Sequence, residues 1–201
     1  KPYIDLAEQL GKFSGQLVET GIKKVNIEFE GAASKLNIKP IISVLLTGLL
    51  KPSSDSVNMV NAPLVAKERG IQVSEVKHER EGDYQSLIKV TVTTENSEQY
   101  IAGTLFGGDK PRLVEVGSVK LEASLASQML YINNEDKPGL IGDLGKLLGN
   151  ANINIANFHL GRGENENSAI ALVEVDEIPT NDLLIKVNEL PSVIYSKLIC
   201  F

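Results

Sequence analysis

The sequence predicts an α+β protein of two domains, and three observations lead to this class. Within residues 1–127, segments with helical spacing come early and segments that alternate between apolar and polar residues follow. Residues 128–201 repeat strand and helix patterns in the order βαββαβ, which is the ferredoxin-like arrangement. The length of 201 residues suffices for two modest domains. We therefore expect an N-terminal α+β domain over 1–127 and a C-terminal ferredoxin-like domain over 128–201.

The first domain opens with a helix, a strand and a second helix. The apolar positions of residues 3–19 fall on one helical stripe, which predicts an amphipathic helix. Residues 22–31 alternate between apolar and polar side chains, which predicts a half-buried strand. Residues 39–50 are apolar on nearly every side but too few to cross a membrane. We expect them to form a buried helix that starts near Pro40.

A short helix and a sheet complete the first domain. In residues 60–70, Asn61 is the predicted N-cap, Pro63 lies in the first turn and Gly70 follows the end. Turns that contain glycine, at residues 81–83 and 107–109, separate several of the segments that come next. Four alternating segments predict an antiparallel sheet packed on the helices, at residues 71–79, 84–95, 98–108 and 112–123.

The second domain is more regular. Its first helix is expected to begin at Pro138 and Gly139 and to end at Gly149 and Asn150, and Thr180 or Asn181 is the expected cap of its second helix. The usual strand order 4-1-3-2 would leave the second strand as an exposed edge, which invites pairing with another chain. The predicted strands are residues 128–133, 152–161, 168–176 and 192–201, with a polar turn at 162–167, and the predicted second helix is 179–190.

Composition excludes several classes of protein. The formal net charge of −6 argues against nucleic-acid and anionic-membrane partners. No apolar run reaches the ~20 residues of a membrane span. Cys200 is the single cysteine, so a disulfide framework is ruled out, and His78 and His159 lack partners at metal-ligand spacing. We therefore expect a cytoplasmic protein without a metal site.

Catalytic motifs are missing as well. The sequence contains no nucleophile elbow, phosphate loop or zinc-protease motif. Gly161 and Gly163 follow a strand without a helix behind them, so they indicate a hairpin turn and not a dinucleotide loop. The chain also starts at Lys1 directly inside an amphipathic pattern, from which we expect it to be a piece of a longer protein. We expect no catalytic residue in this piece.

Two sets of motifs resemble a known family. The run "NNEDKPGLIGDLGKLLG", followed by "NINIANFHLGR", resembles the ACT domain, a small regulatory module that binds amino acids. The runs "VNMVNAPLVAKERGI" and "IAGTLFGG" resemble the allosteric substrate-binding domain that precedes the ACT domain in long forms of D-3-phosphoglycerate dehydrogenase. This resemblance covers essentially the whole chain. It implies a homo-oligomer formed through ACT domains, and catalytic and NAD domains that lie N-terminal to this chain.

The resemblance also implies where an effector would bind. In the family, the effector lies between two ACT domains, against the loop that leads into the first helix. Free N–H groups at that helix start can hold a carboxylate, Asp136 can accept from the ammonium of the ligand, and Asn134 offers both a donor and an acceptor. The predicted L-serine site comprises Asn134, Asp136, Pro138, Gly139, Leu140 and Ile141 of one chain and Asn154 of the other.

Each of these residues also has an interpretation without a ligand. Asp136 could simply be the N-cap of the helix. Asn154 could be an ordinary edge or turn residue, although asparagine is depleted in strands. Gly142 and Gly145 cost helix stability, and close packing of helices, across a dimer for example, explains them better than contact with the ligand.

A second site is implied for the first domain. The family can hold an anion on basic side chains of the final hairpin, and Arg112 and Lys120 fall at two matching positions. Ser124 stands where a third basic residue is expected. The alternative is a solvated surface.

The implied function is regulation: the chain lets L-serine inhibit an NAD-dependent parent enzyme of serine synthesis. This chain itself would hold no cofactor. Two alternatives belong to other classes. One is the ACT-containing part of an L-serine dehydratase, which needs cysteines for an iron–sulfur cluster, and the other is a stand-alone amino-acid sensor.

Overall fold

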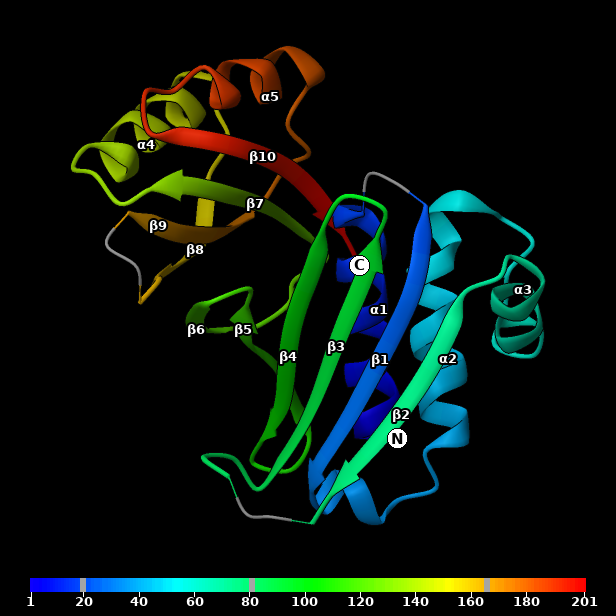
Figure 1. Ribbon diagram of the computed structural model, residues 1–201. Helices are drawn as coiled ribbons and strands as arrows, with labels where there is room; N and C mark the ends of the chain where they lie inside the picture. The colour runs from blue at the N-terminus through cyan, green and yellow to red at the C-terminus, as the bar shows by residue number, and fades with distance from the viewer. Residues whose placement is uncertain (19–20, 80–81, 165–166) are drawn as a thin grey trace. The chain divides into compact units, whose positions relative to one another are not determined.

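The computed structural model describes residues 1–18, 21–79, 82–164 and 167–201. It divides into two compact units, residues 1–117 and 118–201 (Figure 1). The predicted turn at Glu81 and part of the predicted turn 162–167 lie outside the described residues. The domain boundary that the sequence predicts between residues 127 and 128 stays a prediction.

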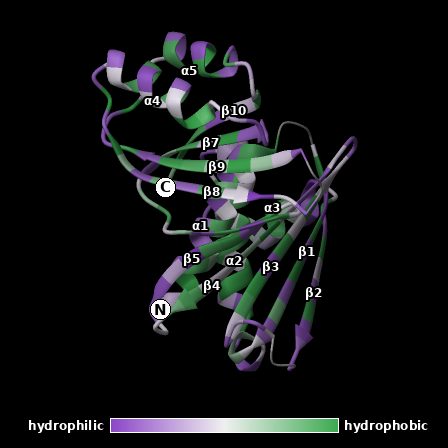
Figure 2. Ribbon diagram, turned by 90° about the vertical axis from the view of Figure 1, so that its left-hand side faces the viewer, coloured by the Kyte–Doolittle hydropathy of each residue, from purple (hydrophilic) through white to green (hydrophobic). Residues whose placement is uncertain are grey.

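The first unit is a mixed sheet with helices on one face (Figure 1). Its strands run in the order β2-β1-β3-β4-β5. Hydrophobic and hydrophilic residues alternate along several of these strands (Figure 2). Helix α1 packs against β3, β4 and β5. The elements are α1 (Pro2–Leu17), β1 (Ile22–Gly31), η1 (Ala32–Lys35), α2 (Lys39–Leu50), η2 (Lys51–Ser53), α3 (Ala62–Glu68), β2 (Gln72–His78), β3 (Ser86–Thr94), β4 (Glu98–Phe106) and β5 (Lys110–Val116).

Glycines bring α1 and α2 into close contact. A Cβ atom added to Gly11 would stand 2.2 Å from the backbone oxygen of Leu45, and one added to Gly48 would stand 2.6 Å from the backbone nitrogen of Lys12. A larger residue at either place would push the helices apart. These helix-interior glycines therefore serve packing, which outweighs their cost in helix propensity.

The prediction of an all-antiparallel sheet is wrong at β2. This strand pairs with β1 in parallel, whereas β3, β4 and β5 follow in antiparallel pairs. The connection from β1 to β2 passes through α2 and α3, and a crossover of that length permits a parallel pair. The alternation of apolar and polar residues predicts a strand and its buried face. It does not predict whether the strand runs parallel or antiparallel to its neighbour.

The start of α3 also differs from the prediction. Asn61 holds the N-cap position, but its side chain makes no capping bond. Its Oδ1 accepts from the backbone N–H of Asn58 at 2.8 Å, and its Nδ2 donates to the oxygen of Ser56 at 3.1 Å. Asparagine at this place therefore closes the preceding loop instead of capping the helix.

The second unit has the predicted ferredoxin-like topology. Its four-stranded sheet runs β10-β7-β9-β8, which confirms the predicted order and places the second strand of the βαββαβ pattern at the edge. The apolar faces of α4 and α5 cover one side of this sheet around Leu144 and Val187, both fully buried. The elements are β6 (Val119–Ala123), β7 (Gln128–Glu135), α4 (Leu140–Asn150), β8 (Ile155–Arg162), β9 (Ser168–Val175), α5 (Asn181–Asn188) and β10 (Val193–Cys200).

Several predicted boundaries in this part of the chain are wrong. Residues 112–123 are not one strand, because a turn with Gly117 at φ 58° separates β5 from β6. Helix α4 begins at Leu140, after the predicted start at Pro138 and Gly139, but its end at Asn150 is the predicted one. Asn152 follows in the left-handed region at φ 56°. At α5 the two candidates for the cap are resolved, because the side chain of Thr180 accepts from the N–H of Leu183 at 3.3 Å.

None of the helices in the described part of the chain is long and apolar enough to cross a membrane.

Candidate functional site

A pocket of about 380 Å³ opens where β7 leads into α4, beside the end of β8. Antiparallel register explains the placement of its walls. Asn134 of β7 and Arg162 of β8 both pair with Ala169 of the strand between them, so the two side chains lie on the same face of the sheet. They stand two strand spacings apart, roughly 10 Å. The lining residues are Asn134, Asp136, Lys137, Pro138, Gly139, Leu140, Ile141, Gly142, Leu160 and Arg162.

Asn134 forms the buried end of this pocket. The residue is only 2% exposed, and its Nδ2 donates to the backbone oxygen of Glu135 at 2.9 Å. Its Oδ1 is buried and has no hydrogen-bond partner among the described residues. A buried acceptor without a partner costs about 1–3 kcal/mol, so a ligand donor at this atom would recover that energy.

Asp136 and Arg162 form an ion pair in the wall of the pocket. The Nε of Arg162 lies 3.3 Å from Oδ2 of Asp136, and the side chains are 73% and 29% exposed. Asp136 does not cap α4, since the N-cap position belongs to Gly139 and no side chain caps this helix. The alternative interpretation of Asp136 as a plain N-cap is therefore wrong, and its role in binding stays a prediction. The turn places the carboxylate beside β8 and away from the helix start.

The helix start itself is open. Gly139 adopts φ 114°, a conformation that side chains disfavour, and its carbonyl accepts the first helical bond from Asp143 at 2.9 Å. The first backbone N–H groups of α4, at Leu140, Ile141 and Gly142, have no side-chain cap. Helix starts carry partial positive charge and attract carboxylates.

The structure brings six of the seven predicted effector residues together in this pocket. The seventh, Asn154, is not a lining residue. It lies just before β8, exposed, and its Nδ2 donates to Oδ2 of Asp176 at 2.8 Å. Its role in a partner chain stays a prediction, as does the role of the other six.

The two residues of the predicted anion site, Arg112 and Lys120, lie on different strands. Arg112 lies on β5 of the first unit, where its Nη1 donates to the oxygen of Pro111 at 2.9 Å and its guanidinium lies 5.7 Å from the centre of the Phe106 ring. Lys120 lies on β6 of the second unit and is exposed. Their joint anion site stays a prediction.

Four lining residues are not among those predicted for the site. Lys137, Leu160 and Arg162 were not predicted at all, and Gly142 was attributed to helix packing. Lys137 is already paired with the carboxylate of Glu135. Arg162 could have been found from the sequence. It is a charged residue directly after a predicted strand, and it lies two positions after Leu160, so both side chains point to the same face of the sheet. Its pairing with Asp136 depends on the fold of the turn and leaves no signal in the sequence.

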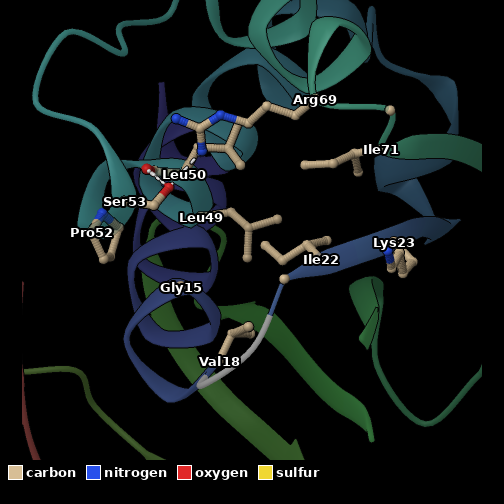
Figure 3. A pocket seen from close by; sticks show the side chains of 12 residues that line it. Gly15, Val18, Ile22, Lys23, Leu49, Leu50, Pro52, Ser53, Arg69 and Ile71 are labelled. Carbon is tan, nitrogen blue, oxygen red and sulfur yellow. Dashed lines mark hydrogen bonds between the residues drawn. The ribbon is translucent and has the colours of Figure 1, made fainter. Parts of the chain in front are cut away.

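The first unit contains a larger cavity, about 680 Å³ (Figure 3). It lies among the C-terminal ends of α1, α2 and α3. Arg69 reaches across it, and its Nη1 donates to Oγ of Ser53 at 2.6 Å. That hydroxyl donates to the oxygen of Leu50, the last residue of α2, at 2.8 Å. A cation at negatively polarised helix ends stabilises the fold, so this arrangement indicates a structural role.

Among the described residues, no group of histidine, cysteine, aspartate or glutamate side chains could hold a metal ion.

Comparison with known proteins agrees with both units. The family described as the D-3-phosphoglycerate dehydrogenase intervening domain matches residues 1–117, and the ACT domain family matches residues 128–191. A D-3-phosphoglycerate dehydrogenase of Bacillus subtilis is 34% identical over 200 residues, 99% of this chain and 38% of the relative. Its counterpart of the same name in Archaeoglobus fulgidus is 35% identical over 196 residues, 96% of this chain and 37% of the relative.

The chain spans little more than a third of the length of these relatives. The match to the intervening domain covers more than half of the chain, and the ACT match lies in the unit that holds the pocket. The chain therefore belongs to the D-3-phosphoglycerate dehydrogenase family and carries its intervening domain and its ACT domain.

Proposed function

We propose that this chain is the regulatory part of an NAD-dependent D-3-phosphoglycerate dehydrogenase and that L-serine binds its ACT domain to inhibit the parent enzyme. The names of the relatives support the choice of enzyme. Serine as the end product of the pathway is the effector that the family resemblance implies. The cofactor belongs to the domains that this chain lacks.

One observation carries the proposal of an effector site. The pocket between β7 and α4 holds a buried acceptor, Oδ1 of Asn134, that no described residue satisfies. Asp136 adds a carboxylate, and the start of α4 adds free N–H groups. A small ligand with an ammonium, a carboxylate and a hydroxyl group can use all three kinds of partner.

We further propose that the site is completed by a second copy of the chain. β8 is one of the two edge strands of its sheet, the other being β10, and edge strands invite pairing. Asn154, just before β8, would reach the pocket of the partner. Gly142 and Gly145 support a close neighbour, because an added Cβ at either position meets nothing within 4 Å in this chain.

Calorimetric titration of the 201-residue chain with L-serine tests the proposal. We expect saturable binding of L-serine, and weaker binding of glycine, which lacks the hydroxyl, and of D-serine, which has the opposite configuration. Equal heats for all three ligands, or none for L-serine, would overturn it. The same sample, mixed with NAD and 3-phosphoglycerate, should produce no reduced cofactor.

A further inference from the structure

The ion pair between Arg162 and Asp136 leaves room for a ligand to bind both side chains. Nε of Arg162 meets Oδ2 of Asp136 at 3.3 Å. Among the described residues, no third side chain bonds to the carboxylate of Asp136 or to the guanidinium of Arg162. Arginine offers five N–H donors and suits a carboxylate through two parallel bonds. The pair therefore keeps one free site for a cation and one for an anion, side by side.

A free α-amino acid matches these two sites. Its ammonium and its carboxylate are attached to one carbon, so they are as close to each other as the groups of the ion pair. When the ammonium meets Asp136 and the carboxylate meets Arg162, opposite charges alternate around a closed ring of four. An amine could bind only Asp136, and a hydroxy acid could bind only Arg162. In either case the other charged group of the protein would gain no ionic contact with the ligand.

We propose that Arg162 determines the specificity of this pocket for zwitterionic α-amino acids, because its guanidinium binds the carboxylate of the ligand while Asp136 binds the ammonium. This inference rests on the proposed effector site and adds Arg162 to the residues predicted to form it. The ligand class is then set within one chain, whatever a second copy contributes.

Other cations near the pocket are less suited to the carboxylate. The ammonium of Lys137 is held by Glu135. The start of α4 carries an acid of its own: Oδ2 of Asp143 lies 3.5 Å from the position that a Cβ of Gly139 would take. This carboxylate offsets part of the positive charge at the helix start, so the free N–H groups of α4 are left to donate to the hydroxyl group of the ligand. Among the described residues, Arg162 forms an ion pair with Asp136 alone. Because the ligand's ammonium would also bind Asp136, Arg162 is the pocket cation best placed to bind the ligand's carboxylate.

A ligand–protein cycle tests the role of Arg162. The chain and its Arg162→Gln variant are each titrated with L-serine and with serinol, which keeps the ammonium and hydroxyl groups but lacks the carboxylate. In the parent, L-serine should bind roughly tenfold more tightly than serinol, the ratio expected for one charge-assisted contact. In the variant, this preference should disappear through weaker serine binding, while the serinol affinity changes little.

The control removes the same charge elsewhere. Lys146→Gln, on the exposed side of α4, should keep the preference of the parent. Arg162→Lys, which keeps the charge but not the planar fork, should give an intermediate ratio. If Arg162→Gln and the parent prefer L-serine over serinol to the same degree, Arg162 does not bind the carboxylate of the ligand. The proposed function then stands without this role of Arg162. If the parent binds no L-serine, both proposals fail.

Discussion

At the scale of single residues, Asn134 has two ends with different surroundings. Its amide nitrogen is bonded to the backbone of Glu135, whereas its oxygen is buried without a described partner. Asn134→Ala removes one ordinary hydrogen bond and one unsatisfied acceptor, and these effects on stability oppose each other. We expect the free energy of unfolding to change by less than about 1 kcal/mol, while affinity for L-serine falls roughly tenfold.

Thermal denaturation and calorimetry of the same variant separate the two effects. Asn133→Ala is the matched control, because Asn133 neighbours Asn134 on β7 but faces the other side of the sheet. It should leave serine affinity unchanged. A variant at Asn134 that binds serine like the parent would show that the buried oxygen takes no part in binding.

Gly139 is the second residue at which the site depends on a special conformation. At φ 114° a side chain is strained, so Gly139→Ala should destabilise the chain by about 1–2 kcal/mol and displace the start of α4. Serine binding should weaken with it. Gly149→Ala serves as comparison, because an added Cβ there meets nothing within 4 Å and alanine favours the helix by up to ~1 kcal/mol. Melting temperatures should therefore move in opposite directions, and two parallel shifts would contradict the assignment of strain.

At the scale of elements, Arg69 and Ser53 join the end of α3 to the end of α2 (Figure 3). Ser53→Ala breaks both bonds of this relay and should cost about 1–2 kcal/mol. Arg69→Ala removes only the outer bond and, at an exposed site, should cost less. Because both changes act on one chain of bonds, the double variant should be little worse than Ser53→Ala alone. Additive losses, measured by urea denaturation, would show that the two residues act independently.

The elements also show how far sequence patterns reach. Helical spacing and strict alternation located β1, α1 and α2, because burial on one face imposes a period on the sequence. The same patterns could not give the parallel direction of β2, which depends on the path of the crossover. They joined β5 to β6, because alternation continues through the turn at Gly117. Arg162 was missed because its partner lies on another strand end, and only the completed fold brings Asp136 to it.

At the scale of the whole molecule, we propose that two copies of the chain complete the pocket. Asn134 and Asp136 line it in one chain, and Asn154 lies just before edge strand β8 of the same chain, where its side chain bonds to Asp176. A two-fold axis would place the same surface on both copies and create two equivalent sites. Serine would then bind the paired state better than the separated chains and would strengthen the dimer by linkage.

A mixed dimer tests whether the pocket is shared. Homodimers of Asn134→Ala and of Asn154→Ala should each bind L-serine poorly, since every site lacks one residue. Chains that carry the two substitutions and different affinity tags are then co-expressed, and the heterodimer is isolated. If the pocket is shared, one of its sites lacks both residues and the other keeps both. About half of the binding stoichiometry should then return at near-normal affinity, as measured by calorimetry. If each pocket lies within one chain, both sites stay defective, and a heterodimer as weak as its parents would refute the shared pocket.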